Sequence, residues 1–130
     1  TMQFGYTIIY VPDVQASLAF FEKAFGLKQR FYHESGYGEL ETGQTVLAFA
    51  SHELGHSNLP EGYIKAHASH QPLGVEIALV TSDVSAAHRQ AVAAGARALK
   101  EPVAKPWGQI VSYLHCPDGT LVELCTPVHS

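Results

Sequence analysis

Apolar residues at the start of the chain change from the spacing of a strand to the spacing of a helix. Residues 4–11 form a run rich in β-branched and aromatic side chains, which favour extended backbone. After Pro12-Asp13, apolar residues recur three and four positions apart until Gly26 ends the pattern. They are Val14, Leu18, Phe21 and Phe25. The pattern predicts a strand followed by an amphipathic helix.

The same order of patterns returns in the second half of the chain. Residues 75–80 again read as a strand, and a helix is predicted to start at Asp83 and to stop at Gly95. Its apolar face consists of Val84, Ala87, Ala91 and Ala94. Asp13 and Asp83 lie 70 positions apart, so the chain has the character of an internal repeat.

Three further strands follow each predicted helix, separated by glycines, prolines and polar turns. They are expected near 28–33, 38–41, 45–50, 97–100, 109–114 and 121–125. The sequence therefore predicts a single α+β domain, residues 1–130, made of two strand–helix–three-strand (βαβββ) modules. We expect module 1 at about 4–51, a linker at about 52–73 and module 2 at about 74–127.

A Pro-Asp-Gly turn near the C-terminus leads into a strand that carries one carboxylate among apolar residues. Proline, aspartate and glycine at 117–119 suit successive positions of a tight turn. Glu123 follows Leu121 and Val122 and precedes Leu124. An ionised carboxylate buried without a partner is costly, so we expect Glu123 to face a cleft, a ligand or a donor.

Composition and charge limit the classes of partner that the protein is expected to bind. The net charge of −4, with 8 basic against 12 acidic residues, disfavours nucleic acid or an anionic membrane as the partner. Apolar runs are too short for a membrane span, and the first residues lack the pattern of a secretory signal. A cytoplasmic location is the simplest interpretation. Cys116 and Cys125 flank the last turn out of register with each other, so we expect two free thiols.

The eight histidines do not form a metal-binding motif in the sequence. His52-His56 and His67-His70 have spacings that would bring two imidazoles together on a helix, but the linker is not a clear helix. These four are expected to be exposed or to bind metal only adventitiously. Among the others, we expect His88 on the outer face of the second helix, and His115 and His129 at the surface.

The repeated βαβββ order and three sequence motifs resemble the vicinal oxygen chelate superfamily, which includes glyoxalase I, the bleomycin-resistance proteins and the extradiol dioxygenases. The motifs are 13–21, 77–79 together with 83–84, and the turn and strand at 117–124. The resemblance implies that each module curls into half of an open barrel around a central cleft for a small molecule. It also implies a homodimer, because paired chains commonly complete these pockets.

The resemblance further indicates where a divalent metal would bind. Superfamily enzymes use four symmetric positions on the first and last strands of each module, filled mostly with histidine and glutamate. Carried over strand by strand, these positions are Tyr6, Ala48, Glu76 and Glu123. Only Glu123 matches the usual residue, and two carboxylates with a phenol make a poor site for a catalytic first-row metal. A divalent metal stays possible, but no cofactor is predicted.

Glu76 and Glu123 are therefore candidates for acid–base catalysis or for holding a cationic or hydroxyl-rich ligand. The alternative is that each is satisfied by Tyr6, Gln109 or a backbone donor and has no chemical role. Further ligand-binding candidates share an aromatic ring that could line the cleft. They are Tyr6, Trp107, Tyr113 and Phe49, of which Phe49 fits the core better.

Two functions from different classes follow. One is a small-molecule binding protein, like the bleomycin-resistance proteins, that works without the usual metal. The other is a metal-dependent lyase, isomerase or dioxygenase with a non-standard ligand set, so enzyme activity stays undecided at this point. Phosphate-binding loops and serine-hydrolase elbows are missing from the sequence.

Overall fold

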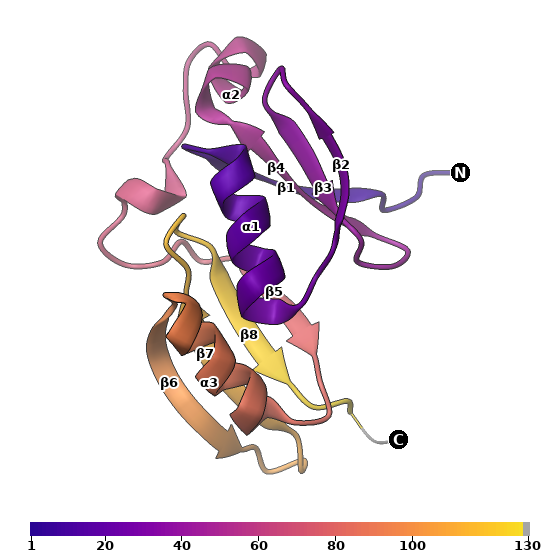
Figure 1. Ribbon diagram of the computed structural model, residues 1–130, viewed down its shortest axis with the longest axis vertical. Helices are drawn as coiled ribbons and strands as arrows, with labels where there is room; N and C mark the ends of the chain where they lie inside the picture. Colours follow the sequence, from indigo (N-terminus) through magenta and orange to yellow (C-terminus); the bar gives the residue numbers. More distant parts are fainter. Residues whose placement is uncertain (129–130) are drawn as a thin grey trace.

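The computed structural model describes residues 1–128 and contains eight strands and three helices, with a short 3-10 helix in the linker (Figure 1). The helices are α1 (Val14–Phe25), α2 (His52–Asn58) and α3 (Val84–Ala94), and the 3-10 helix η1 spans Ala66–Ala68. The strands are β1 (Tyr6–Val11), β2 (Gln29–His33), β3 (Tyr37–Leu40), β4 (Val46–Ser51), β5 (Glu76–Val80), β6 (Arg97–Ala104), β7 (Ile110–His115) and β8 (Leu121–Cys125).

The strands form two four-stranded mixed sheets with the same topology. Their orders are β1-β4-β3-β2 and β5-β8-β7-β6, and the first and last strands of each module run parallel. Ile8 pairs with Ala48 in the first sheet, and Ala78 pairs with Glu123 in the second. The sheets do not close into a barrel. The predicted α+β fold of two similar βαβββ modules is therefore confirmed.

Helices α1 and α3 pack against each other and cover one face of the sheets. Asp13 and Asp83 cap them, each accepting a hydrogen bond from a backbone N–H three residues later. Both helices end at the expected glycine, Gly26 or Gly95, each with positive φ. One continuous hydrophobic core fills the space between helices and sheets, with side chains from both modules.

The structure corrects two predictions, one about the linker and one about His88. The linker is not irregular throughout, because Ser51 caps a helix at its start, α2. His88 is 4% exposed and lies on the inner face of α3, not the outer face. Its Nδ1 is 2.9 Å from Ser112 Oγ, and its Nε2 is 2.6 Å from a carboxylate oxygen of Glu101. His88 follows Val84 by four residues, so helical spacing places both on one face.

The predictions for the two cysteines and for His115 have different outcomes. Cys116 and Cys125 are free and buried, as expected. His115 is half-buried rather than exposed, and His129 lies outside the described residues. None of the helices in residues 1–128 is long and apolar enough to cross a membrane.

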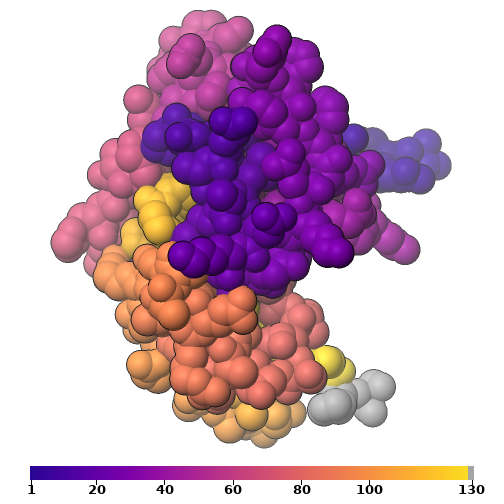
Figure 2. Space-filling model, in the orientation of Figure 1, coloured from indigo at the N-terminus to yellow at the C-terminus, as the bar shows by residue number. Residues whose placement is uncertain are grey.

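The Pro-Asp-Gly turn connects both modules and the linker. Asp118 accepts hydrogen bonds from the backbone and hydroxyl of Thr120, and its other oxygen accepts one from Ser17 Oγ on α1 at 2.6 Å. Gly119 has φ +94° and lies directly against the backbone of Ala66 and His67. Figure 2 shows this turn, in yellow, between α1 in indigo and the linker in pink. The turn thus locks the linker onto the two modules.

We expect Gly119→Ala to lower the free energy of unfolding much more than Gly43→Ala does. Both glycines have φ near +95°, but a Cβ at Gly43 meets no atom, whereas one at Gly119 would overlap the backbone of η1. Gly43→Ala should cost about 1–2 kcal/mol of unfolding free energy from backbone strain alone. Gly119→Ala should cost about 3–4 kcal/mol, because overpacking adds to the strain. Equal losses in urea denaturation would contradict the close packing of the linker.

Candidate functional site

Each sheet has a second face, opposite the helices, that no other element of the chain covers fully. Alternation along the strands sends every other side chain to this face. In β5, Ile77 and Leu79 pack against the core, while Glu76, Ala78 and Val80 are exposed. We call this surface of the second sheet the open face of module 2, and its counterpart, with Tyr6 and Ile8 exposed on β1, the open face of module 1.

The strand register relates the four family positions to one another. Tyr6 pairs with Val46 as Glu76 pairs with Leu121, and Ala48 stands in β4 where Glu123 stands in β8. Tyr6 and Glu76 are therefore equivalent by the internal repeat, as are Ala48 and Glu123. Within one chain, only the two glutamates come together. Tyr6 and Ala48 belong to the other sheet.

Glu76 and Glu123 form a carboxylate pair on the open face of module 2. A hydrogen bond from Glu76 to Glu123, desolvation and like-charge repulsion raise the pKa of Glu76 to about 7. The pair therefore shares a proton at neutral pH, because two adjacent carboxylates resist full ionisation. Such a pair can bind a cation in place of the proton, or donate and accept protons near pH 7.

Two neighbours on the same face complete the surroundings of the pair. Tyr113 lies opposite Glu123 in the β7–β8 register. Desolvation and then a hydrogen bond to Glu123 raise the pKa of the Tyr113 hydroxyl. Desolvation and the Glu123 carboxylate also raise the pKa of the Cys125 thiol, which keeps it protonated and unreactive. Glu123 thus has Tyr113 and Cys125 as neighbours, whereas Gln109, a predicted partner, donates its amide to the Thr126 carbonyl.

The residues at the four family positions do not fit a catalytic divalent metal. They supply two carboxylates that share a proton, one phenol and one methyl group, with no imidazole. Among residues 1–128, no group of three or more histidine, cysteine, aspartate or glutamate side chains is placed to hold a metal ion. No catalytic step through a metal is therefore derived for this chain.

The other residues singled out from the sequence lie in separate places. Trp107 is 64% exposed in the turn before β7, and its Nε1 donates to Gln109 Oε1. Tyr113 lies three residues after the first residue of β7, so about 10 Å of strand lies between the turn that carries Trp107 and Tyr113. Phe49 is fully buried and packs on Phe21 with ring centroids 5.0 Å apart, which makes it a core residue.

A second carboxylate, which the sequence patterns did not single out, lies on the open face of module 1. Glu39 is only 9% exposed, and its two oxygens are bound separately. Tyr37 donates its hydroxyl to one at 2.7 Å, and Arg30 Nε lies 3.2 Å from the other. Burial and then Glu39 raise the pKa of Tyr37. The signal was an acidic residue inside a short apolar strand, the same signal that marked Glu123.

The linker lines a cavity between the modules, a role that the sequence patterns did not indicate. Its volume is about 320 Å³, and it lies between β1, the start of β5 and β8, and the linker. The linker wall consists of Leu59, Tyr63, Ile64, Ala66 and Leu73. The glutamates and the indole do not line it. Burial lowers the pKa of His52 behind this wall, and His67, Lys65 and His56 lower it further.

Comparison with known proteins gives a consistent family assignment. The family model described as Glyoxalase/Bleomycin resistance protein/Dioxygenase superfamily matches residues 3–124. The uncharacterized protein YwbC of Bacillus subtilis is 32% identical over 124 residues, which cover 91% of this chain and 92% of YwbC.

Solved structures show the same fold at lower identity. A glyoxalase/bleomycin resistance protein/dioxygenase family enzyme from Burkholderia phytofirmans matches with a TM-score of 0.82 and 20% identity, covering 98% of this chain and 100% of that one. A glyoxalase-related enzyme from Fulvimarina pelagi matches with a TM-score of 0.81 and 21% identity, covering 98% and 89%. At these identities the similarity establishes the fold alone.

The shared proton predicts a pH-dependent effect of Glu76→Gln on stability. The raised pKa of Glu76 means that its contribution is fully present below its ordinary value and is lost as the pH rises through about 7. Glutamine mimics the protonated form, so the variant should match the wild type at pH 5. At pH 8.5 it should melt about 1–3 °C higher, a small effect because Glu76 is exposed.

Glu61→Gln, at an exposed linker position, is the matched control and should show no such trend. Melting curves followed by circular dichroism at both pH values measure the difference. A Glu76→Gln effect that is the same at pH 5 and pH 8.5 would contradict the shared proton.

Proposed function

Because the chain belongs to the Glyoxalase/Bleomycin resistance protein/Dioxygenase superfamily, we propose that it binds a small molecule on the open face of module 2, without the usual metal. The ligand is a cationic molecule with an apolar or aromatic body. The Glu76–Glu123 pair carries this proposal, since it is an acidic receptor with one proton that a cation can replace. Three features of the chain support it.

The first feature is the electrostatic state of the pair. Keeping two carboxylates adjacent costs free energy above neutral pH, and that cost is relieved either by a proton or by an ammonium group between them. Tyr113 lies opposite Glu123 in the β7–β8 register, and the two strands hold both side chains on the same face. A bound ammonium ion would therefore find two acceptor groups already positioned, which lowers the entropic cost of binding.

The second feature is the apolar surface beside the pair. Val80 on β5 is 65% exposed, and Val103 on β6 is also exposed. Val103 pairs with Val111, which itself pairs with Cys125, so these side chains continue the open face beyond the carboxylates. An apolar ligand body can lie along this surface while its charged end reaches Glu76 and Glu123.

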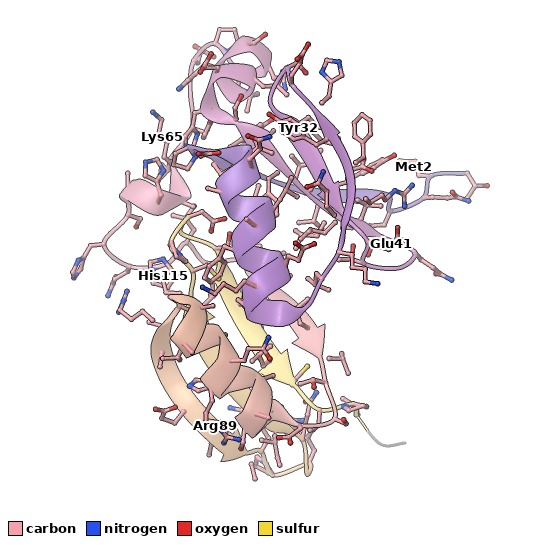
Figure 3. All side chains as sticks on the ribbon, viewed as in Figure 1. Met2, Tyr32, Glu41, Lys65, Arg89 and His115 are labelled. Atoms are coloured by element: carbon pink, nitrogen blue, oxygen red, sulfur yellow. The ribbon has the colours of Figure 1, made fainter. Side chains whose placement is uncertain are left out.

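The third feature suggests that a second chain encloses the ligand. The open face of module 1 exposes Tyr6, Ile8 and Phe31. The N-terminal arm adds Phe4 and also Met2, which extends away from the sheets (Figure 3). Apolar surface of this extent commonly marks an interface. In the proposed homodimer, the open face of module 1 of one chain covers the open face of module 2 of the other.

The metal-dependent alternative has no comparable support in the chain. The pair at Glu76 and Glu123 lacks an imidazole partner, and Ala48 cannot coordinate an ion. The dimer would add Tyr37 and the Arg30–Glu39 ion pair to the enclosed space. These groups suit hydrogen bonding to a polar ligand better than coordination of a redox or Lewis-acid metal.

Ligand binding is tested with aromatic ammonium compounds, each paired with an uncharged analogue of the same shape. The charged member of a pair should raise the melting temperature of the wild type, because it binds only the folded state. Glu123→Gln should abolish this shift, while Glu22→Gln on the exposed surface of α1 should leave it unchanged. Equal shifts from charged and uncharged members, or a shift retained in Glu123→Gln, would contradict the proposal.

The oligomeric state is tested separately by light scattering coupled to size exclusion. The wild type should elute at twice the chain mass of 14.1 kDa. Ile8→Lys, in the open face of module 1, should shift it to a monomer, because a buried charge without a partner is costly. Val92→Lys, on the exposed side of α3, should stay dimeric. A monomeric wild type at micromolar concentration would rule out the enclosed site.

A further inference from the structure

We propose that His52 and His67 form a binding site for a transition metal ion of the zinc or nickel type, which fastens helix α2 to η1 across the linker. The site lies apart from the carboxylate pair and does not depend on the proposed function. The sequence spacings suggested His52 with His56 and His67 with His70, but the fold pairs the first member of each instead.

The distance between the two rings fits a shared metal ion. His52 Nε2 and His67 Nδ1 are 3.2 Å apart, and the ring centroids are 5.0 Å apart. Two imidazole nitrogens at about 2.0–2.1 Å from one tetrahedral zinc ion are separated by about 3.3–3.4 Å. The metal-free pair shares one N–H between these nitrogens. The two nitrogens need to move apart by only about 0.1–0.2 Å, and both rings must turn so that their lone pairs point to the ion.

A hydrogen bond at the other nitrogen of His52 orients the ring for metal binding. Tyr63 Oη lies 2.6 Å from His52 Nδ1. When Nδ1 carries the proton and donates it to Tyr63, Nε2 has a free lone pair directed at His67. Histidines that bind metals typically donate their other N–H to a partner in this way, which orients the ring.

The surroundings hold both rings in position before any ion binds. Tyr63 stacks on Tyr10 of β1 with centroids 4.8 Å apart, and its hydroxyl lies against Gly55, the buried glycine of α2. On the other side, the backbone of His67 lies against Gly119. The ligands therefore come from two segments that separate contacts fix to the sheets.

Two imidazoles leave the remaining coordination positions to water. Affinity should therefore be lower than at a structural site with four protein ligands. Zinc, copper and nickel all suit imidazole nitrogens, whereas magnesium and calcium prefer oxygen. An ion here would also stiffen the cavity wall, because Leu59, Tyr63, Ile64 and Ala66 lie between the two ligands.

The test is calorimetric titration of protein without a histidine tag, using zinc chloride and, separately, nickel chloride. The wild type should bind one ion per chain. His67→Ala should weaken binding at least about tenfold, because one of two protein ligands is lost. His70→Ala is the matched control, three residues further along the same exposed segment, and should bind like the wild type. Tyr63→Phe should weaken binding about tenfold while keeping both ligands.

A second measurement confirms that the variants are folded. Circular dichroism should show the same helix content for all of them, and zinc should raise the melting temperature of the wild type and His70→Ala but not of His67→Ala. A wild type that binds neither ion at millimolar concentration would overturn the proposal. Equal losses in His67→Ala and His70→Ala would do so as well, because they would indicate scattered surface binding.

Discussion

The parallel pairing of the first and last strands of each module fixes the position of nearly every residue considered above. Helix α3 takes the chain from β5 to β6 at the far edge of the sheet, and β7 and β8 then return it, so that β5 and β8 lie side by side. Because side chains alternate along a strand, Val122 and Leu124 can enter the core only if Glu123 points the other way. The same pairing places Glu76 on that open face, and the two carboxylates meet. A slip of one residue in either strand would turn the glutamate of that strand toward the core.

The two modules differ in the residues that occupy equivalent positions, and this difference bears on function. In module 1 the positions of Glu76 and Glu123 are occupied by Tyr6 and Ala48, and the acidic group has moved to Glu39, where Arg30 and Tyr37 satisfy it. In module 2 the two carboxylates interact with each other, and among residues 1–128 neither forms an ion pair with a basic side chain. One module thus carries a carboxylate paired with a cationic side chain, and the other carries two carboxylates side by side. This asymmetry makes module 2 the better candidate for binding a cation.

The fold was largely predictable, because it depends on local periodicity and on residues that end helices. Asp13, Gly26, Asp83 and Gly95 mark both helices within the sequence itself. The carboxylate pair was predictable only through the internal repeat and the resemblance to a superfamily. The contact of His52 with His67 was not predictable, since it depends on how a linker of low periodicity folds over β1. Likewise, His88 was misplaced because its polarity was weighed above its helical spacing.

The central claim is that Glu76 and Glu123 share a proton which a cationic ligand replaces. Carbon-13 NMR of the glutamate side-chain carboxyls, followed from pH 4 to pH 9, observes this proton directly. The account predicts that the Glu76 carboxyl titrates with a pKa of about 7 and that a bound aromatic ammonium compound shifts its titration to lower pH. Titration of Glu76 at its ordinary value, unaffected by any such compound, would contradict it.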